Sequence, residues 1–82
     1  LDIAAELRRG LAMHQAGNFD GAALAYERVL RQRPGQADAL NLLGVIHSER
    51  GEPQRAAPLF ERAVAADPGV PPFRCNLGQA LL

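Results

Sequence analysis

Residues 37–67 of the chain read ADALNLLGVIHSERGEPQRAAPLFERAVAAD, and the spacing of their apolar residues decides the fold. Apolar residues recur at i, i+3 and i+4 in both halves of this stretch, which is the period of an amphipathic helix. Gly51 ends the first half as a helix C-terminus does, Pro53 suits the first turn of a second helix, and Pro68 stops that helix. The stretch therefore predicts two helices joined by a tight turn. The residues at this helical spacing are Leu40, Leu43, Ile46 and His47 in the first helix, and Ala56, Leu59, Phe60, Ala63 and Val64 in the second.

The same pattern recurs along the chain with a period of 34 residues. Shifting the 82-residue sequence by 34 leaves 82 − 34 = 48 compared positions, of which eleven are identical. Chance at ordinary composition gives about three or four. A unit of this length cannot enclose a core alone, so neighbouring units must bury each other's apolar faces. The identities pair Ala5 with Ala39, Gly10 with Gly44, Gly17 with Gly51, Ala22-Ala23 with Ala56-Ala57, Glu27-Arg28 with Glu61-Arg62, Pro34-Gly35 with Pro68-Gly69, Leu43 with Leu77, and Gly44 with Gly78.

The repeat predicts an all-α chain of antiparallel helix pairs. The units are about 3–36, 37–70 and a partial 71–82, forming a single region over 1–82. Both ends fall inside patterned sequence, so we expect the chain to be part of a longer protein. The expected helices cover residues 5–16, 20–32, 37–49, 53–67 and 73–82.

Two glycines and one proline lie inside these expected helices. Gly44 and Gly78 each cost about 1 kcal/mol relative to alanine, which predicts a close helix approach in which Phe60 or Tyr26 fills the space. Pro58 removes the amide that would bond back to the carbonyl of residue 54, so we expect a slight kink or a late helix start.

Composition excludes several classes of protein. Nine Arg balance nine Asp plus Glu, so the chain lacks the excess positive charge of nucleic-acid and anionic-membrane binders. No apolar run is long enough to cross a bilayer, which argues against membrane insertion. The single cysteine, Cys75, cannot form an internal disulfide, so no oxidising compartment is needed and the cytoplasm is favoured.

The second unit resembles the tetratricopeptide repeat, with only His47 departing clearly from the family pattern. In the first unit Glu6 and Arg9 depart at core-facing positions, and in the third Arg74 departs. The resemblance implies a right-handed superhelix of two full units plus the first helix of a third. The matching positions of the second unit are Leu40, Leu43, Gly44, Ala56, Phe60, Ala63 and Pro68; the third offers Leu77, Gly78 and Leu81.

No set of residues has the spacing that catalysis or metal binding requires. His14 and His47 have no Cys, Asp or Glu at metal-ligand spacing, and no glycine-rich loop could hold a phosphate. His47 is interpreted as a packing residue and His14 as exposed. Ser48 is the only serine and there is no threonine, so a serine-based triad is not expected. The sequence indicates a non-enzymatic chain with no cofactor.

The resemblance implies a concave groove lined by the first helix of each unit. Leu7, Leu11, Leu42 and Val45 are apolar there, and they either pack internally or hold a ligand's apolar side chains. The Lys and Asn residues with which one family subclass binds chaperone tails are absent. Of the Asn ladder of O-linked N-acetylglucosamine transferases, only Asn76 is present. The groove candidates are Leu7, Arg8, Leu11, His14, Gln15, Asp38, Asn41, Leu42, Val45, Ser48, Glu49, Asn76 and Gln79.

We therefore expect a protein-interaction module that binds a protein or peptide in this groove. The alternative is a substrate-presenting or targeting segment of a larger enzyme, such as a protein glycosyltransferase or methyltransferase. Self-association is a third expectation, because the last helix lacks a partner for Leu77, Leu81 and Leu82.

Overall fold

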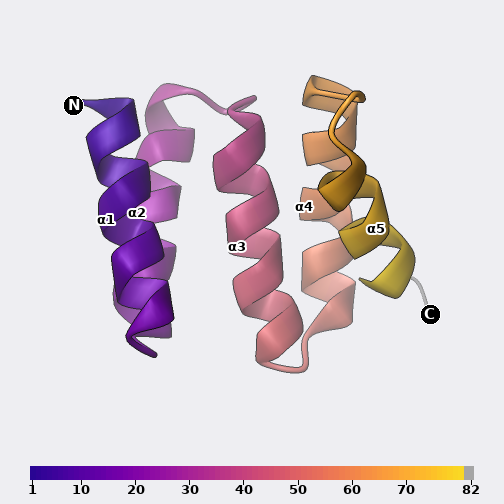
Figure 1. Ribbon diagram of the computed structural model, residues 1–82, viewed down its shortest axis with the longest axis horizontal. Helices are drawn as coiled ribbons and strands as arrows, with labels where there is room; N and C mark the ends of the chain where they lie inside the picture. The colour runs from indigo at the N-terminus through magenta and orange to yellow at the C-terminus, as the bar shows by residue number, and fades with distance from the viewer. Residues whose placement is uncertain (81–82) are drawn as a thin grey trace.

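The computed structural model describes residues 1–80 as five helices without a strand in that range (Figure 1). The all-α prediction is confirmed. The last helix begins two residues before the expected start, because prolines fit a first turn whose amides need no partner. The expected end of that helix, at Leu81 and Leu82, lies outside the described residues. The helices are α1 (Ile3–Gln15), α2 (Phe19–Gln32), α3 (Ala37–Glu49), α4 (Pro53–Ala66) and α5 (Pro71–Ala80).

Each helix pair is joined by a turn built on a left-handed glycine. Gly17 has φ +84° and Gly51 has φ +76°, a conformation that glycine adopts without steric cost. In the first turn the amide of Gly17 donates to the carbonyl of His14 at 3.0 Å, and the amide of Gly51 donates to that of Ser48 at the same distance. The repeat in the sequence is thus a repeat in backbone geometry.

Within each pair, the helices approach closely where a mid-helix glycine faces an aromatic ring. A Cβ added at Gly10 would lie 2.6 Å from Cε1 of Tyr26, and one at Gly44 would lie 2.6 Å from Cε1 of Phe60. The close-packing prediction is confirmed for Gly44. For Gly78 it stays a prediction, because residues 1–80 contain no second helix of that unit, and a Cβ added there meets no atom within 4 Å.

Consecutive pairs stack so that α3 contacts both α1 and α5. In Figure 1, α1 and α5 lie in front of α2 and α4, and α3 lies between them. Tyr26 and Ile46 belong to one buried cluster, and Leu40 and Phe73 to another, so every unit shares its core with the next. This stacking brings the first helix of each unit onto one face.

Some residues that depart from the family pattern, or that are unusual in a helix, differ in the structure from what the sequence predicts. Glu6 is buried, as its core-facing position predicts, whereas Arg9 is exposed and its predicted core-facing position is wrong. Pro58 lies exposed inside α4, which starts at Pro53, so a late helix start is wrong. None of the helices within residues 1–80 has the length and apolar character needed to span a bilayer.

Candidate functional site

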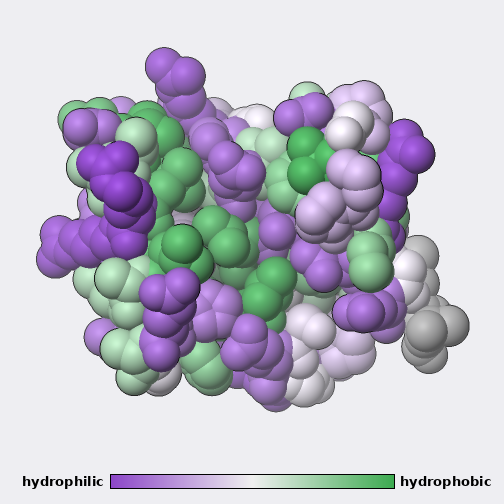
Figure 2. All heavy atoms as spheres, in the orientation of Figure 1, coloured by the Kyte–Doolittle hydropathy of each residue, from purple (hydrophilic) through white to green (hydrophobic). Residues whose placement is uncertain are grey.

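The face formed by α1, α3 and α5 carries the predicted groove residues. Figure 2 looks onto this face and shows apolar atoms gathered over α1 and α3 with polar atoms around them. Seven predicted residues are exposed, five are half-buried and Asn41 is buried. The exposed ones are Arg8, Leu11, Gln15, Asp38, Ser48, Glu49 and Gln79, and the half-buried ones are Leu7, His14, Leu42, Val45 and Asn76.

The apolar patch, as we call it here, consists of Leu7, Leu11, Leu42 and Val45. Its residues differ in burial, because Leu11 is exposed and the other three are half-buried. Leu7 and Leu42 pack against the buried cluster around Tyr26. Leu11 leaves 39% of its surface open, a large fraction for a leucine within the stack. The patch therefore consists of a packed base with an exposed side chain above it.

Two polar pairs connect neighbouring first helices. Nε2 of His14 lies 2.9 Å from Oε1 of Glu49, linking α1 to α3. Nδ2 of Asn76 donates to Oδ1 of Asn41 at 2.9 Å, linking α5 to α3. The two residues of each pair are 35 positions apart in the sequence, one more than the repeat period of 34. A residue in one unit therefore contacts the residue one position beyond its equivalent in the next unit.

The exposure predicted for His14 is wrong. Only 13% of its side chain is accessible, because it bonds to Glu49 and packs edge-on against Phe19 with 5.3 Å between ring centroids. His47 is half-buried as expected, and its Nδ1 lies 3.1 Å from Oε1 of Glu52. This hydrogen bond holds the pKa of the Glu52 carboxyl below its usual value of 4.5.

A pocket of about 180 Å³ opens between α3 and α5 on the groove face. We call it the α3–α5 pocket. Phe60, one of its lining residues, was not among the predicted site residues because its spacing marks it as core. The sequence pattern of a buried aromatic residue is the same whether or not that residue also lines a pocket. The lining residues are Val45, Ser48, Glu49, Phe60, Asn76 and Gln79.

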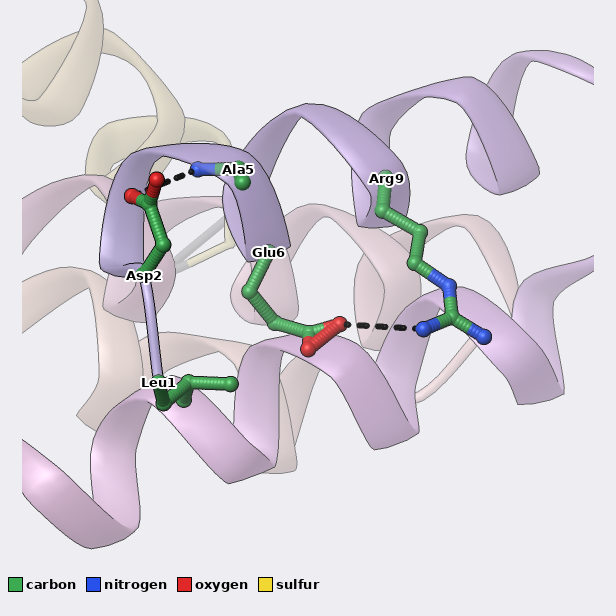
Figure 3. Close-up of a pocket in the computed structure, with 5 residues that line it drawn as sticks. All are labelled: Leu1, Asp2, Ala5, Glu6 and Arg9. Atoms are coloured by element: carbon green, nitrogen blue, oxygen red, sulfur yellow. Dashed lines mark hydrogen bonds and ion pairs between the residues drawn. The ribbon is translucent and has the colours of Figure 1, made fainter.

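A second pocket of about 160 Å³ lies at the N-terminal end of α1, outside the groove (Figure 3). Asp2 caps the helix by accepting from the amide of Ala5 at 3.2 Å. Glu6 exposes only 6% of its side chain, and Nη1 of Arg9 lies 3.8 Å from its Oε1. That oxygen has no hydrogen-bond partner within residues 1–80, so the carboxylate is poorly compensated for its burial.

Within residues 1–80 no three His, Cys, Asp or Glu side chains come close enough to hold a metal ion. Cys75 is exposed, and its Sγ lies 4.0 Å from Nε2 of Gln79. Burial raises the pKa of the Tyr26 hydroxyl, which leaves that group protonated inside the core.

Comparison with known proteins agrees with the repeat geometry. The sequence profile of the tetratricopeptide repeat matches residues 4–71. Peroxisome biogenesis protein 5 of Arabidopsis thaliana is 36% identical over 62 residues, which are 76% of this chain and 8% of that protein. A mutant of the O-GlcNAc transferase of Thermobaculum terrenum superposes with a TM-score of 0.93 at 39% identity, covering 96% of this chain and 15% of that one. The chain thus spans a small part of each relative.

Proposed function

Because the chain belongs to the tetratricopeptide repeat family, whose members are protein-interaction modules, we propose that it binds a peptide or protein segment in the groove without catalysing a reaction. The observation that carries this proposal is the exposed Leu11, which lies on α1 beside the packed leucines of a face built by three first helices. An apolar side chain of the bound segment would cover Leu11 and remove both surfaces from water.

The polar surroundings support a peptide as the ligand. Asn76 and Gln79 offer amides, and Ser48 offers a hydroxyl, all on the same face as the apolar patch. An apolar centre with polar groups around it is the composition of protein interfaces. The zero net charge gives little long-range attraction, so groove shape and these few groups would select the partner.

The groove assignment is tested with peptides selected from a random display library and measured by fluorescence anisotropy. Leu11→Glu alone, and Leu11→Glu with Val45→Glu, should abolish binding while far-UV circular dichroism keeps its helical signal. Leu24→Glu is the matched control, because Leu24 leaves 53% of its surface exposed on α2. Retained binding by the double variant, or equal loss in the Leu24 variant, would contradict the proposal.

A second candidate is that the chain is the substrate-presenting segment of a larger enzyme. Its support is the likeness to part of an O-GlcNAc transferase, stated above. The coding sequence on both sides of the chain distinguishes the candidates. A catalytic domain joined to the array would favour the enzyme, and repeats without one would favour the interaction module alone.

A further inference from the structure

The α3–α5 pocket has the size of a site for one side chain. Its volume of about 180 Å³ is below the 300–1,000 Å³ typical of pockets for drug-sized ligands. Val45 and Phe60 provide its apolar part, and Phe60 is 2% exposed. A side chain with an apolar stem and a polar end would match this lining.

Hydrogen bonding within the pocket leaves three neutral acceptor oxygens for a ligand. One N–H of Asn76 is used by Asn41, which leaves its Oδ1 and a second N–H. The Nε2 of Gln79 lies 4.0 Å from the Sγ of Cys75, which leaves its Oε1 and another N–H. Ser48 adds a hydroxyl that can accept or donate. The neutral groups can therefore accept from a ligand's donors, and the carboxylate of Glu49 adds oxygens that only accept.

Glu49 gives the pocket its charge. It is the one ionisable side chain in the lining, and 44% of that side chain is exposed. His14 holds its Oε1, and within residues 1–80 no hydrogen bond engages its Oε2. The carboxylate is therefore held through one oxygen by His14 on α1, and its other oxygen can accept hydrogen bonds from a cation.

We propose that this pocket receives the guanidinium group of an arginine side chain belonging to the segment in the groove, an inference that rests on the proposed function. Guanidinium carries five N–H donors in one plane, whereas an ammonium is a compact point charge. The acceptors come from two helices, with Glu49 on α3 and Asn76 and Gln79 on α5, and a planar group with several donors can reach both. The methylene stem would lie on Val45 and Phe60.

The test is a titration of the 15N-labelled chain with N-acetyl-arginine-N-methylamide, followed by amide chemical shifts. Saturable shifts are expected at Ser48, Asn76 and Gln79. The citrulline analogue has nearly the same shape without the charge, and it should bind at least about fivefold more weakly, as should the lysine analogue. Equal affinity for citrulline or lysine, or shifts absent from these three residues, would overturn the proposal.

Two variants separate the carboxylate from general effects of charge. Glu49→Gln should weaken arginine-amide binding by about tenfold, because a charge-assisted hydrogen bond is replaced by a neutral one. Glu27→Gln removes the same charge from an exposed position on α2, outside the groove, and it should leave the affinity unchanged. Thermal melts verify that both variants are folded. Equal affinity of the Glu49 variant and the unmodified chain would refute the role of the carboxylate.

The display selection distinguishes this inference from the groove proposal. Arginine should be enriched at one position of the selected peptides, and the Glu49→Gln variant should lose that enrichment. Peptides that bind through Leu11 without any arginine preference would leave the groove proposal standing and overturn this one. If no peptide is selected at all, the groove proposal fails, and the arginine-amide titration still decides whether the pocket binds guanidinium.

Discussion

Replacing Gly44 by alanine is expected to destabilise the chain, although alanine is the better helix former. A Cβ at position 44 would lie 2.6 Å from Cε1 and 2.8 Å from Cδ1 of Phe60, closer than Cβ atoms approach other carbons in folded proteins. Phe60 is buried and also borders the α3–α5 pocket, so its ring can make room only by displacing core side chains or by leaving its packed position for that pocket. The extra methyl group therefore acts as overpacking of the core.

The expected size of the effect follows from two opposing contributions. Overpacking a well-packed core costs about 1–3 kcal/mol, and two ring atoms inside 3.0 Å place this site in the upper half of that range. Alanine recovers about 1 kcal/mol of helix propensity. The net loss is about 1–2 kcal/mol, which lowers the melting temperature of a domain of this size by about 5–15 °C.

Thermal melts followed by circular dichroism measure this effect, with two further glycines as references. Gly10→Ala should behave like Gly44→Ala, because its Cβ would meet Tyr26 at the same 2.6 Å. Gly78→Ala should keep or raise the melting temperature, because its Cβ meets no atom within 4 Å. A melting temperature of Gly44→Ala at or above that of the unmodified chain would refute the reasoning.

Glu6→Leu should raise the melting temperature by about 4–8 °C, the equivalent of about 1 kcal/mol, because it removes a buried carboxylate without a hydrogen bond to its Oε1; a lower value would show that the carboxylate stabilises the fold. Because the His47 hydrogen bond lowers the pKa of Glu52, the stabilisation from this pair is present above the usual pKa and lost as pH falls through the lowered one. The melting temperatures of the unmodified chain and Glu52→Gln should thus differ at neutral pH and converge in acid, and a difference independent of pH would contradict this. For self-association through α5, light scattering over a dilution series should show mass rising with concentration, whereas a monomer throughout would exclude it.

The fold could be predicted because the helix ends and the helix faces are each specified by residues close together in the sequence. Gly51 can be recognised as a helix end from its place after an apolar stripe, and it has the positive φ that such an end requires. The closeness of Gly44 to Phe60 follows from the cost of glycine in a helix, which must be offset by a contact. The same reasoning at Gly78 stays a prediction, because the contact requires a second helix of the third unit, which residues 1–80 do not contain.

The site could be predicted only in outline, because its contacts depend on how neighbouring units are staggered. The sequence aligns at an offset of 34, whereas the pairs His14–Glu49 and Asn41–Asn76 form at an offset of 35. That one-residue difference comes from the packing of one first helix against the next, and it moves His14 from an expected solvent position to a partly buried one. The α3–α5 pocket likewise requires Phe60 on α4 to lie beneath residues of α5, which no periodicity reports.

The stagger also explains why the groove differs from one side to the other. At the offset of 35, the pair that corresponds to Asn41 and Asn76 between α3 and α5 is Leu7 and Leu42 between α1 and α3. The leucines pack on the core, whereas the asparagines bond to each other and leave acceptors near the α3–α5 pocket. The same geometry therefore gives an apolar surface on the α1 side and a polar, negatively charged one on the α5 side. A segment lying across the three helices would meet these environments in a fixed order, which favours one direction of binding over the reverse.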